Sequence, residues 1–374
     1  MVRRIIVALA AMACALLAWT GTAGAKGKAG DAIPGSYIVV VEPGADPKAV
    51  AEAQDAETKH VYRQAIKGFS AKLSSEQVAK LRKSKKVAYV EQDRVYTAST
   101  TQSGATWGLD RIDQRSLPLS TTYTYNRTGS GTNAYVIDTG IYTAHADFGG
   151  RARNVYDAFG GTGNDCNGHG THVAGTVGGA QFGVAKAVNL RGLRVLNCSG
   201  SGSTSGIIAA LNWLSANHVK PAVANMSLGG GYSSSLNSAT TNLVNSGVFV
   251  AVAAGNESQN ACNVSPASAS GTYTSAASDR TDTRASFSNY GGCVDGYAPG
   301  VSITSAWRNG GTRTISGTSM ASPHTAGVGA LYKSNFGDAP ASTIVSWINT
   351  NATTNVIRSN VSGTPNRLLY KAGL

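Results

Sequence analysis

Apolar positions divide the chain into three stretches with different patterns. Residues 5–19 form one continuous apolar run. In residues 36–98, short apolar strands alternate with polar helical segments. From residue 105 onward, longer apolar strands are separated by helical patterns with small and apolar residues. These patterns predict a leader, a small domain and a large domain.

The leader has the pattern of a secretory signal peptide. Arg3 and Arg4 precede the apolar run, which is too short to span a bilayer. The segment 23–25 (AGA) then offers the small residues of a cleavage site. We therefore predict that residues 1–25 are removed on export, that the protein is extracellular, and that it has no membrane partner.

Residues 36–98 predict a small α+β domain with the order β-α-β-α-β. Strands are expected at 36–41, 62–72 and 86–91, and helices at 46–57 and 74–82. Pro47 supports the first helix start, and Ser74 with Glu76 supports the second. A polar connector follows at 97–104.

Residues 105–374 predict an α/β domain. Nearly continuous apolar strands are expected at 134–137, 219–225 and 248–253, and helices at 169–178, 205–217, 232–246 and 319–336. Strands that are apolar on both faces and separated by helices indicate a parallel sheet covered on both sides. In such sheets functional residues gather at the carboxyl ends of the strands.

The composition is that of a folded chain, with 42% hydrophobic and 14% charged residues. The net charge of +12 is spread along the sequence rather than concentrated. Residues 1–99 carry 15 basic and 9 acidic side chains, and residues 100–374 carry 17 and 11. Solvated surface charge explains this spread better than nucleic-acid binding, so we expect no nucleic-acid partner.

Four cysteines remain after the leader: Cys166, Cys198, Cys262 and Cys293. An even number in an exported chain predicts two disulfides, and four cysteines allow three pairings. Pairing of neighbours in the sequence, Cys166–Cys198 and Cys262–Cys293, closes loops of roughly 30 residues. A four-cysteine zinc site is disfavoured because the close C-x₂-C pairs are missing.

Three motifs carry candidate chemistry. Asp138 ends an apolar strand, His169 lies in the segment 167–176 (NGHGTHVAGT), and Ser319 lies in 317–323 (GTSMASP) at the start of a long apolar helix. Taken singly, they could be a turn cap, a metal ligand and a helix N-cap. Together they supply a nucleophile, the base that it needs and the carboxylate that orients the base.

These motifs, in the order Asp, His, Ser, resemble those of the subtilisin-like serine proteases. Within that family the chain is most similar to the proteinase K and aqualysin-type secreted enzymes, through 107–113 (WGLDRID), 286–291 (SFSNYG) and 315–321 (ISGTSMA). The resemblance covers about residues 105–370. It implies a three-layer subtilisin-like domain with a mainly parallel central sheet. Residues 36–98 resemble the inhibitory prosegment of such enzymes.

The resemblance implies a role for each motif residue. Asp138 is expected to orient the histidine, His169 to act as general base, Ser319 to attack and form an acyl-enzyme, and Asn256 to donate to the oxyanion. Substrate-binding residues are expected in three glycine-rich or apolar segments: Gly200, Ser201, Gly202, Ser227, Leu228, Gly229, Ala253, Ala254 and Gly255. The uncharged walls of the last two segments predict a broad apolar or aromatic preference.

Further expectations follow from the same resemblance. No cofactor is needed for catalysis, and a structural calcium is expected on Asp295 with carbonyls near Ser270 and Thr272. Residues 26–99 form a prosegment that acts as intramolecular chaperone and inhibitor, and residues 100–374 form the peptidase domain. The chain is expected to cut itself near Ser99, to act on polypeptides as a monomer, and to carry no further C-terminal domain.

Three other functions fit the sequence less well. An inactive subtilisin-like binding protein is expected to lack a motif residue, and none is missing. An esterase or lipase carries its serine in G-x-S-x-G, before the acid and the histidine. A protease inhibitor accounts for residues 36–98 alone.

Overall fold

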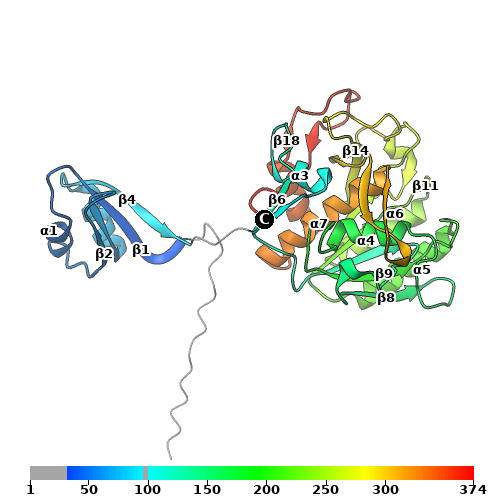
Figure 1. Ribbon diagram of the computed structural model, residues 1–374, viewed down its shortest axis with the longest axis horizontal. Helices are drawn as coiled ribbons and strands as arrows, with labels where there is room; N and C mark the ends of the chain where they lie inside the picture. Colours follow the sequence, from blue (N-terminus) through cyan, green and yellow to red (C-terminus); the bar gives the residue numbers. More distant parts are fainter. Residues whose placement is uncertain (1–31, 96–99) are drawn as a thin grey trace, which may run out of the picture. The chain divides into compact units, whose positions relative to one another are not determined.

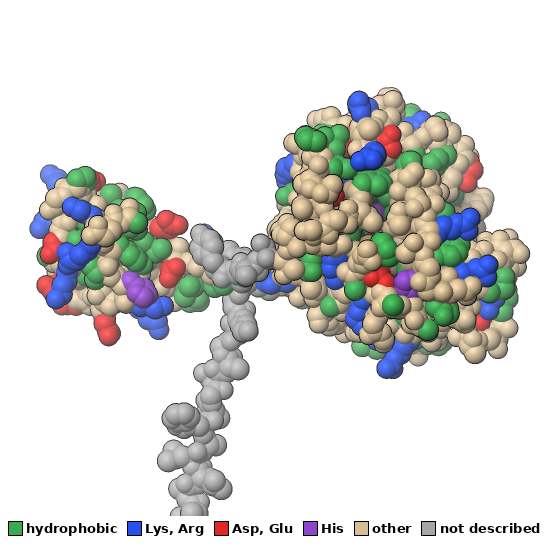
Figure 2. Space-filling view, viewed as in Figure 1, with side chains coloured by type: hydrophobic (Ala, Val, Ile, Leu, Met, Phe, Trp, Pro, Cys, Tyr) green, Lys and Arg blue, Asp and Glu red, His purple; other side chains and the backbone are tan. Residues whose placement is uncertain are grey.

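The computed structural model describes residues 32–95 and 100–374, which divide into two compact units near residue 97 (Figure 1). The signal peptide predicted at 1–25 and the predicted cleavage position at Ser99 lie outside the described residues. Within the described ranges, no helix has both the length and the apolar character that crossing a membrane requires. On the face shown in Figure 2, charged side chains are scattered over both units.

The small unit is an antiparallel sheet with the strand order β2-β3-β1-β4. Its strands are β1 (Ala32–Val41), β2 (Thr58–Tyr62), β3 (Gly68–Lys72) and β4 (Val87–Arg94). Its helices are α1 (Pro47–Glu52) and α2 (Ser75–Lys83). Alternate strand residues such as Val39 and Phe69 share one core with Val50 of α1 and Leu81 of α2, so both helices cover the same face of the sheet.

Two predictions for the small unit need correction. The single strand expected at 62–72 is the end of β2, a turn and β3, which gives the order β-α-β-β-α-β. β3 begins at Gly68, where a side chain would collide with the Val39 carbonyl of β1, so close strand pairing rather than an interruption explains this glycine. The first helix also ends earlier than predicted, at Glu52. The start of α2 is as expected, because Ser74 and Gln77 form a reciprocal capping box.

The large unit is built on a nine-stranded sheet with the order β18-β19-β15-β14-β12-β10-β7-β9-β8. All neighbouring strands are parallel except β18 and β19. The strands are β7 (Asn133–Asp138), β8 (Ala152–Asp157), β9 (Asn189–Arg194), β10 (Ala222–Met226), β12 (Phe249–Ala253), β14 (Tyr273–Ser278), β15 (Gly296–Pro299), β18 (Thr353–Thr354) and β19 (Arg367–Leu368).

Helices cover both faces of this sheet, which gives the expected three layers. They are α3 (Trp107–Asp113), α4 (His169–Gly178), α5 (Thr204–Asn217), α6 (Ser234–Asn245), α7 (Thr318–Phe336) and α8 (Ala341–Asn351). In β7, Val136 packs in one core with α4, α7 and α8, whereas Ile137 packs in the other core with α5 and α6. This alternation explains why the strands read as continuous apolar runs.

Short elements complete the large unit. Three antiparallel pairs lie outside the main sheet: β5 (Thr100–Ser103) with β6 (Thr122–Tyr125), β11 (Gly230–Gly231) with β13 (Val264–Ser265), and β16 (Ile303–Ala306) with β17 (Thr312–Ile315). Three 3₁₀ turns lie at Ala146–Phe148, Ala261–Asn263 and Arg308–Gly310. The hairpin β16–β17 leads directly into α7, which carries Ser319.

Candidate active site

The three motif residues lie at ends of elements in the large unit. Asp138 is the last residue of β7, His169 is the first residue of α4, and Ser319 is the second residue of α7. Both helices pack against the same face of the sheet. The parallel sheet therefore brings together the carboxyl end of a strand and the N-termini of two helices.

Asp138 and His169 form a short hydrogen bond between their side chains. The Nδ1 atom of His169 lies 2.8 Å from Oδ1 of Asp138, which is fully buried, whereas the His169 side chain is 25% exposed. Burial by itself lowers the pKa of His169. The charge and hydrogen bond of Asp138 and the charge of Asp165 outweigh burial, so the pKa stands above its usual value of 6.5. The imidazole is thus oriented by a carboxylate that also favours its protonated form.

Ser319 faces the same cavity as His169. This cavity has a volume of about 510 Å³, and both side chains line it. The Ser319 hydroxyl donates to the carbonyl of Ser227 at 3.2 Å, and the Ser227 hydroxyl donates to the carbonyl of Ser319 at 2.7 Å. Because a serine hydroxyl has one proton, transfer to His169 requires that Ser319 exchange this hydrogen-bond partner.

Asn256 lies three residues beyond the end of β12. Its Oδ1 atom accepts hydrogen bonds from the backbone N–H of Thr318 at 2.8 Å and from the Thr318 hydroxyl at 3.0 Å. These contacts fix the amide at the N-terminus of α7 and leave its Nδ2 donors unused by them. Asn256 and Ser319 line a second cavity of about 250 Å³.

The predicted substrate-binding residues line these two cavities, with one exception. The first cavity is bordered by Gly200, Ser201, Gly202, Ser227, Leu228 and Gly229, and the second by Leu228, Gly229, Ala253 and Gly255. Ala254 instead is fully buried, and its N–H bonds to Ser275 of the neighbouring strand. Ala254 follows the last residue of β12 and lines neither cavity, so its part in substrate binding stays a prediction.

Sequence reasoning missed a charged residue in the second cavity. Glu257 lines this cavity together with Gln259. Its Oε2 atom accepts hydrogen bonds from the backbone N–H of Asn256 and from Nδ2 of Asn289, both at 2.9 Å. The segment that was expected to be uncharged thus continues into a carboxylate. In the sequence, the place of Glu257 directly after Asn256 could have indicated that it lies in this cavity.

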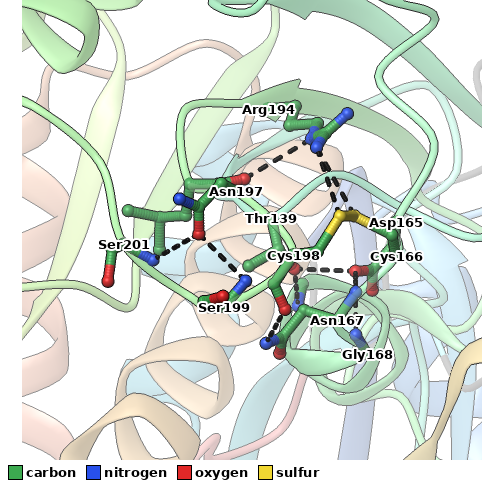
Figure 3. Close-up of a disulfide and its surroundings, with 12 residues drawn as sticks. Thr139, Asp165, Cys166, Asn167, Gly168, Arg194, Asn197, Cys198, Ser199 and Ser201 are labelled. Atoms are coloured by element: carbon green, nitrogen blue, oxygen red, sulfur yellow. Dashed lines mark hydrogen bonds between the residues drawn. A yellow bond between two sulfur atoms is a disulfide. The ribbon is translucent and has the colours of Figure 1, made fainter.

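The four cysteines pair as sequence neighbours, Cys166–Cys198 and Cys262–Cys293. Figure 3 shows that the first bridge joins the loop before His169 to the segment 199–202. Around it, Nδ2 of Asn167 donates to the Cys198 carbonyl at 2.9 Å, and Nη2 of Arg194 lies 3.4 Å from the Cys166 sulfur. One bridge therefore connects the loop before His169 with the edge of the first cavity.

Besides His145, two other histidines, His172 and His324, are buried in the large unit. Nε2 of His172 lies 3.0 Å from the Ile303 carbonyl, and Nδ1 of His324 lies 2.8 Å from the Met320 carbonyl. Burial lowers the pKa of each to about 4. Among the described residues, no group of three or more His, Cys, Asp or Glu side chains could hold a metal ion.

The residues expected to hold calcium lie at the amino ends of β14 and β15, whereas Asp138 lies at the carboxyl end of β7. Ser270 and Thr272 precede β14, and Asp295 precedes the adjacent parallel strand β15, next to Thr274. Oδ2 of Asp295 accepts the Thr274 N–H at 2.8 Å, and burial raises the pKa of Asp295 to about 6. A desolvated carboxylate beside the ends of two strands fits a hard cation with oxygen ligands.

Comparison with known proteins agrees with this geometry. Residues 129–370 match the model of the subtilase family, and residues 36–99 match the peptidase inhibitor I9 family. The chain is 48% identical to the extracellular serine proteinase of Thermus sp. (strain Rt41A), over 92% of this chain and 91% of that protein. It is 46% identical to proteinase R of Parengyodontium album, over 91% of this chain and 90% of that protein.

A solved structure is also similar. The crystal structure of a cold-adapted subtilisin-like serine proteinase superposes with a TM-score of 0.71 at 52% identity, covering 72% of this chain and 99% of that one. The fold is thus that of a subtilisin-like serine proteinase with a mainly parallel central sheet. The chain belongs to the subtilase family, and it is a secreted serine protease made with an I9-type prosegment.

Proposed function

We propose that this protease cleaves internal peptide bonds with Asp138, His169 and Ser319 as its catalytic triad. The contact of 2.8 Å between His169 and Asp138, in a cavity shared with Ser319, carries this proposal. His169 takes the proton of the Ser319 hydroxyl as Oγ attacks the substrate carbonyl, and Asp138 stabilises the imidazolium that forms. The same imidazolium then protonates the leaving amine.

Two hydrogen-bond donors are proposed for the negatively charged oxygen of the tetrahedral intermediate. Nδ2 of Asn256 is left available by the bonds that its oxygen makes to Thr318. The backbone N–H of Ser319 lies in the first turn of α7, where the helix dipole also favours negative charge. Collapse of the intermediate expels the amine and leaves an acyl group on Ser319, which water then removes with His169 again as base.

The substrate is proposed to bind as an extended strand between segments 199–202 and 227–230, since both border the first cavity. The second cavity then takes the side chain before the cut bond. Its apolar and glycine walls favour apolar or aromatic side chains. Glu257 adds tolerance for long cationic side chains. The enzyme is proposed to act as a monomer.

The triad is tested by single and double substitution. Ser319→Ala and His169→Ala are each expected to reduce kcat by about 10⁶-fold, the magnitude known for subtilisin, another member of this family. The double variant should lose little more than either single variant, because the two residues act as a unit. Peptide hydrolysis by the purified mature domain measures this, and additive losses would contradict the assignment.

We also propose a structural calcium ion held by Asp295 with the carbonyls of Ser270 and Thr272. When bound, calcium supplies positive charge to the desolvated carboxylate and joins the starts of β14 and β15. Chelation should therefore lower the midpoint of thermal unfolding. Hydrolysis at low temperature should persist, since the proposed chemistry uses no metal. Immediate inactivation of the still-folded enzyme by a chelator would contradict the structural role.

A further inference from the structure

A second buried carboxylate lies beside the proposed general base. Asp165, four residues before His169, is 4% exposed. Its Oδ1 atom accepts hydrogen bonds from the Thr139 hydroxyl (2.9 Å) and from the backbone N–H groups of Asn167 (2.9 Å) and Gly168 (2.8 Å), as Figure 3 shows in part. Its Oδ2 atom accepts the N–H (3.0 Å) and the hydroxyl (2.6 Å) of Thr171.

These bonds supply a cap that helix α4 lacks. The N-cap residue of α4 is Gly168, which has φ of 113° and no side chain to accept a hydrogen bond. A larger residue is excluded there, because a Cβ would collide with the ring of Trp307. The N–H groups of the first turn still need acceptors. Asp165 takes the Thr171 N–H, and Asn167 takes that of His169 at 3.1 Å.

Asp165 also reaches the strand that carries Asp138. The hydroxyl of Thr139, the residue after Asp138, donates to Asp165 and accepts the N–H of Gly170 at 2.9 Å. One carboxylate therefore binds both the end of β7 and the start of α4. The relative position of Asp138 and His169 depends on this junction.

We propose that Asp165 is a positioning residue for His169, which fixes the start of α4 against the end of β7 and places a second negative charge toward the imidazolium. This inference rests on the proposed triad. Charge develops on His169 only when it accepts the proton of Ser319, so a fixed carboxylate nearby stabilises the transition state more than the ground state.

Few other charges face His169 from the elements around it. β7 contributes Asp138, and α4 contributes His172, which is buried and whose pKa of about 4 leaves it neutral at the working pH. The hairpin β16–β17 packs against Gly168 through Trp307, with Arg313 stacked 4.7 Å from that ring. The described residues of α7 and of segment 199–202 that border the cavity are uncharged. Removal of the Asp165 charge should therefore be visible in the titration of His169.

The test is the pH profile of kcat/KM for Asp165→Asn, measured with a short peptide substrate. Loss of the negative charge lowers the pKa of His169, so the acid limb should move to lower pH. The altered junction should also reduce kcat by roughly 10- to 100-fold. A purely structural role would lower the amount of folded enzyme but leave the acid limb in place.

Asp157→Asn is the matched control. Asp157 is another carboxylate of the same region with a side chain 3% exposed, and it accepts the N–H groups of Phe159 and Gly163, both at 2.9 Å. It pairs with Arg194 and is not among the charges that act on His169. Its replacement should lower stability without moving the limb. The proposal would be overturned if the acid limb of the pH profile did not move in Asp165→Asn, or if it moved equally in Asp165→Asn and Asp157→Asn.

A second pair of variants covers the case in which Asp165→Asn does not fold. Thr139→Val removes the hydroxyl that joins Asp165 to Gly170 but keeps every charge, so kcat should fall several-fold at constant KM. Thr139→Ser should restore it. If Thr139→Val and Thr139→Ser had equal activity, the proposed role of the Thr139 hydroxyl at this junction would be wrong. If instead Ser319→Ala or His169→Ala stayed active, the triad itself would fail, which separates the two proposals.

Discussion

Asn256 illustrates how a single side chain is prepared for a transition state. Thr318 holds its oxygen, and its Nδ2 donors remain for the substrate oxyanion. Asn256→Ala should therefore lower kcat by about 10²–10³-fold with little change in KM, the size known for such a donor in subtilisin. Steady-state kinetics on a peptide amide measure both constants.

The control for this variant is Gln259→Ala. Gln259 lines the same cavity as Asn256 but has no proposed part in oxyanion binding, so its loss should act on KM rather than kcat. A large rise of KM at constant kcat in Asn256→Ala would assign Asn256 to ground-state binding instead.

Glu257 is the residue that distinguishes this pocket from a purely apolar one. Glu257→Gln keeps the size of the side chain and removes its charge. The ratio of kcat/KM for lysine over phenylalanine before the cut bond should fall several-fold, and the difference should shrink with added salt, because the group is exposed. A ratio that does not change in low salt would show that Glu257 takes no part in selection.

The residues predicted from sequence were those that lie in specific motifs. Asp138, His169, Ser319 and Asn256 stand in such motifs, and the structure places them around two adjacent cavities. Asp165 and Glu257 were missed, since each also depends on a hydrogen-bond partner far away in the sequence, Thr139 for Asp165 and Asn289 for Glu257. Only the fold brings these hydrogen-bond partners together.

At the scale of elements, the two disulfides form a natural comparison. They close loops of nearly equal sequence separation, 32 and 31 residues, so the chain-entropy model assigns each about 3–4 kcal/mol. Only Cys166–Cys198 joins the His169 loop to the cavity edge. Replacing both cysteines of either pair by serine should lower stability similarly. The first replacement alone should raise KM for peptides that extend several residues before the cut.

The measurement needs thermal unfolding and kinetics on a short and a long peptide for each double variant. Equal KM values in the two variants would remove the link between this bridge and substrate binding. Peptide mapping without reduction tests the pairing itself, and a Cys166–Cys293 peptide would refute it.

The helices with a clear sequence pattern were predicted accurately, whereas the strands whose bounds depend on pairing with other strands were not. The helix expected at 169–178 has those bounds in the structure, and α7 begins one residue before the predicted 319. The segment 62–72 was misjudged because its two strands are separated by a turn that holds few typical turn residues. Its glycine is required by the neighbouring backbone of β1, which the local sequence does not reveal.

At the scale of the whole molecule, buried histidines predict a loss of stability in acid. His172 and His324 have a pKa of about 4 in the fold and of 6.5 when exposed. Between these values the unfolded chain binds protons that the folded chain does not, so the free energy of unfolding falls as pH falls from 6.5 to 4. The loss is on the order of a few kcal/mol.

Two other titratable groups, His169 and Asp295, bear on the size of this loss of stability. The raised pKa of His169 gives a contribution that is already complete below pH 6.5 and adds no slope there. In calcium-free enzyme, Asp295, with a pKa raised to about 6, offsets part of the loss. The unfolding midpoint of enzyme blocked at Ser319 should fall across this range, and less steeply in His324→Gln. A slope that is the same in both would contradict the assignment to His324.

The last prediction concerns how the two units cooperate in maturation. A largely parallel sheet relies on non-local pairing, which forms slowly, whereas the small unit is a four-stranded antiparallel sheet within a short stretch of chain and has its own core. We therefore expect the prosegment to fold early, to assist folding of the large unit, and to inhibit it once cut free. The enzyme is expected to cut its own chain within two residues of the Ser99–Thr100 bond, because residues 96–99 (YTAS) before this bond are uncharged and mostly small. Ser319→Ala, expressed without other proteases, should accumulate as a precursor that begins near Lys26, as read by intact mass and N-terminal sequencing. If that variant still matured at residue 100, another protease would make the cut and self-processing would be wrong.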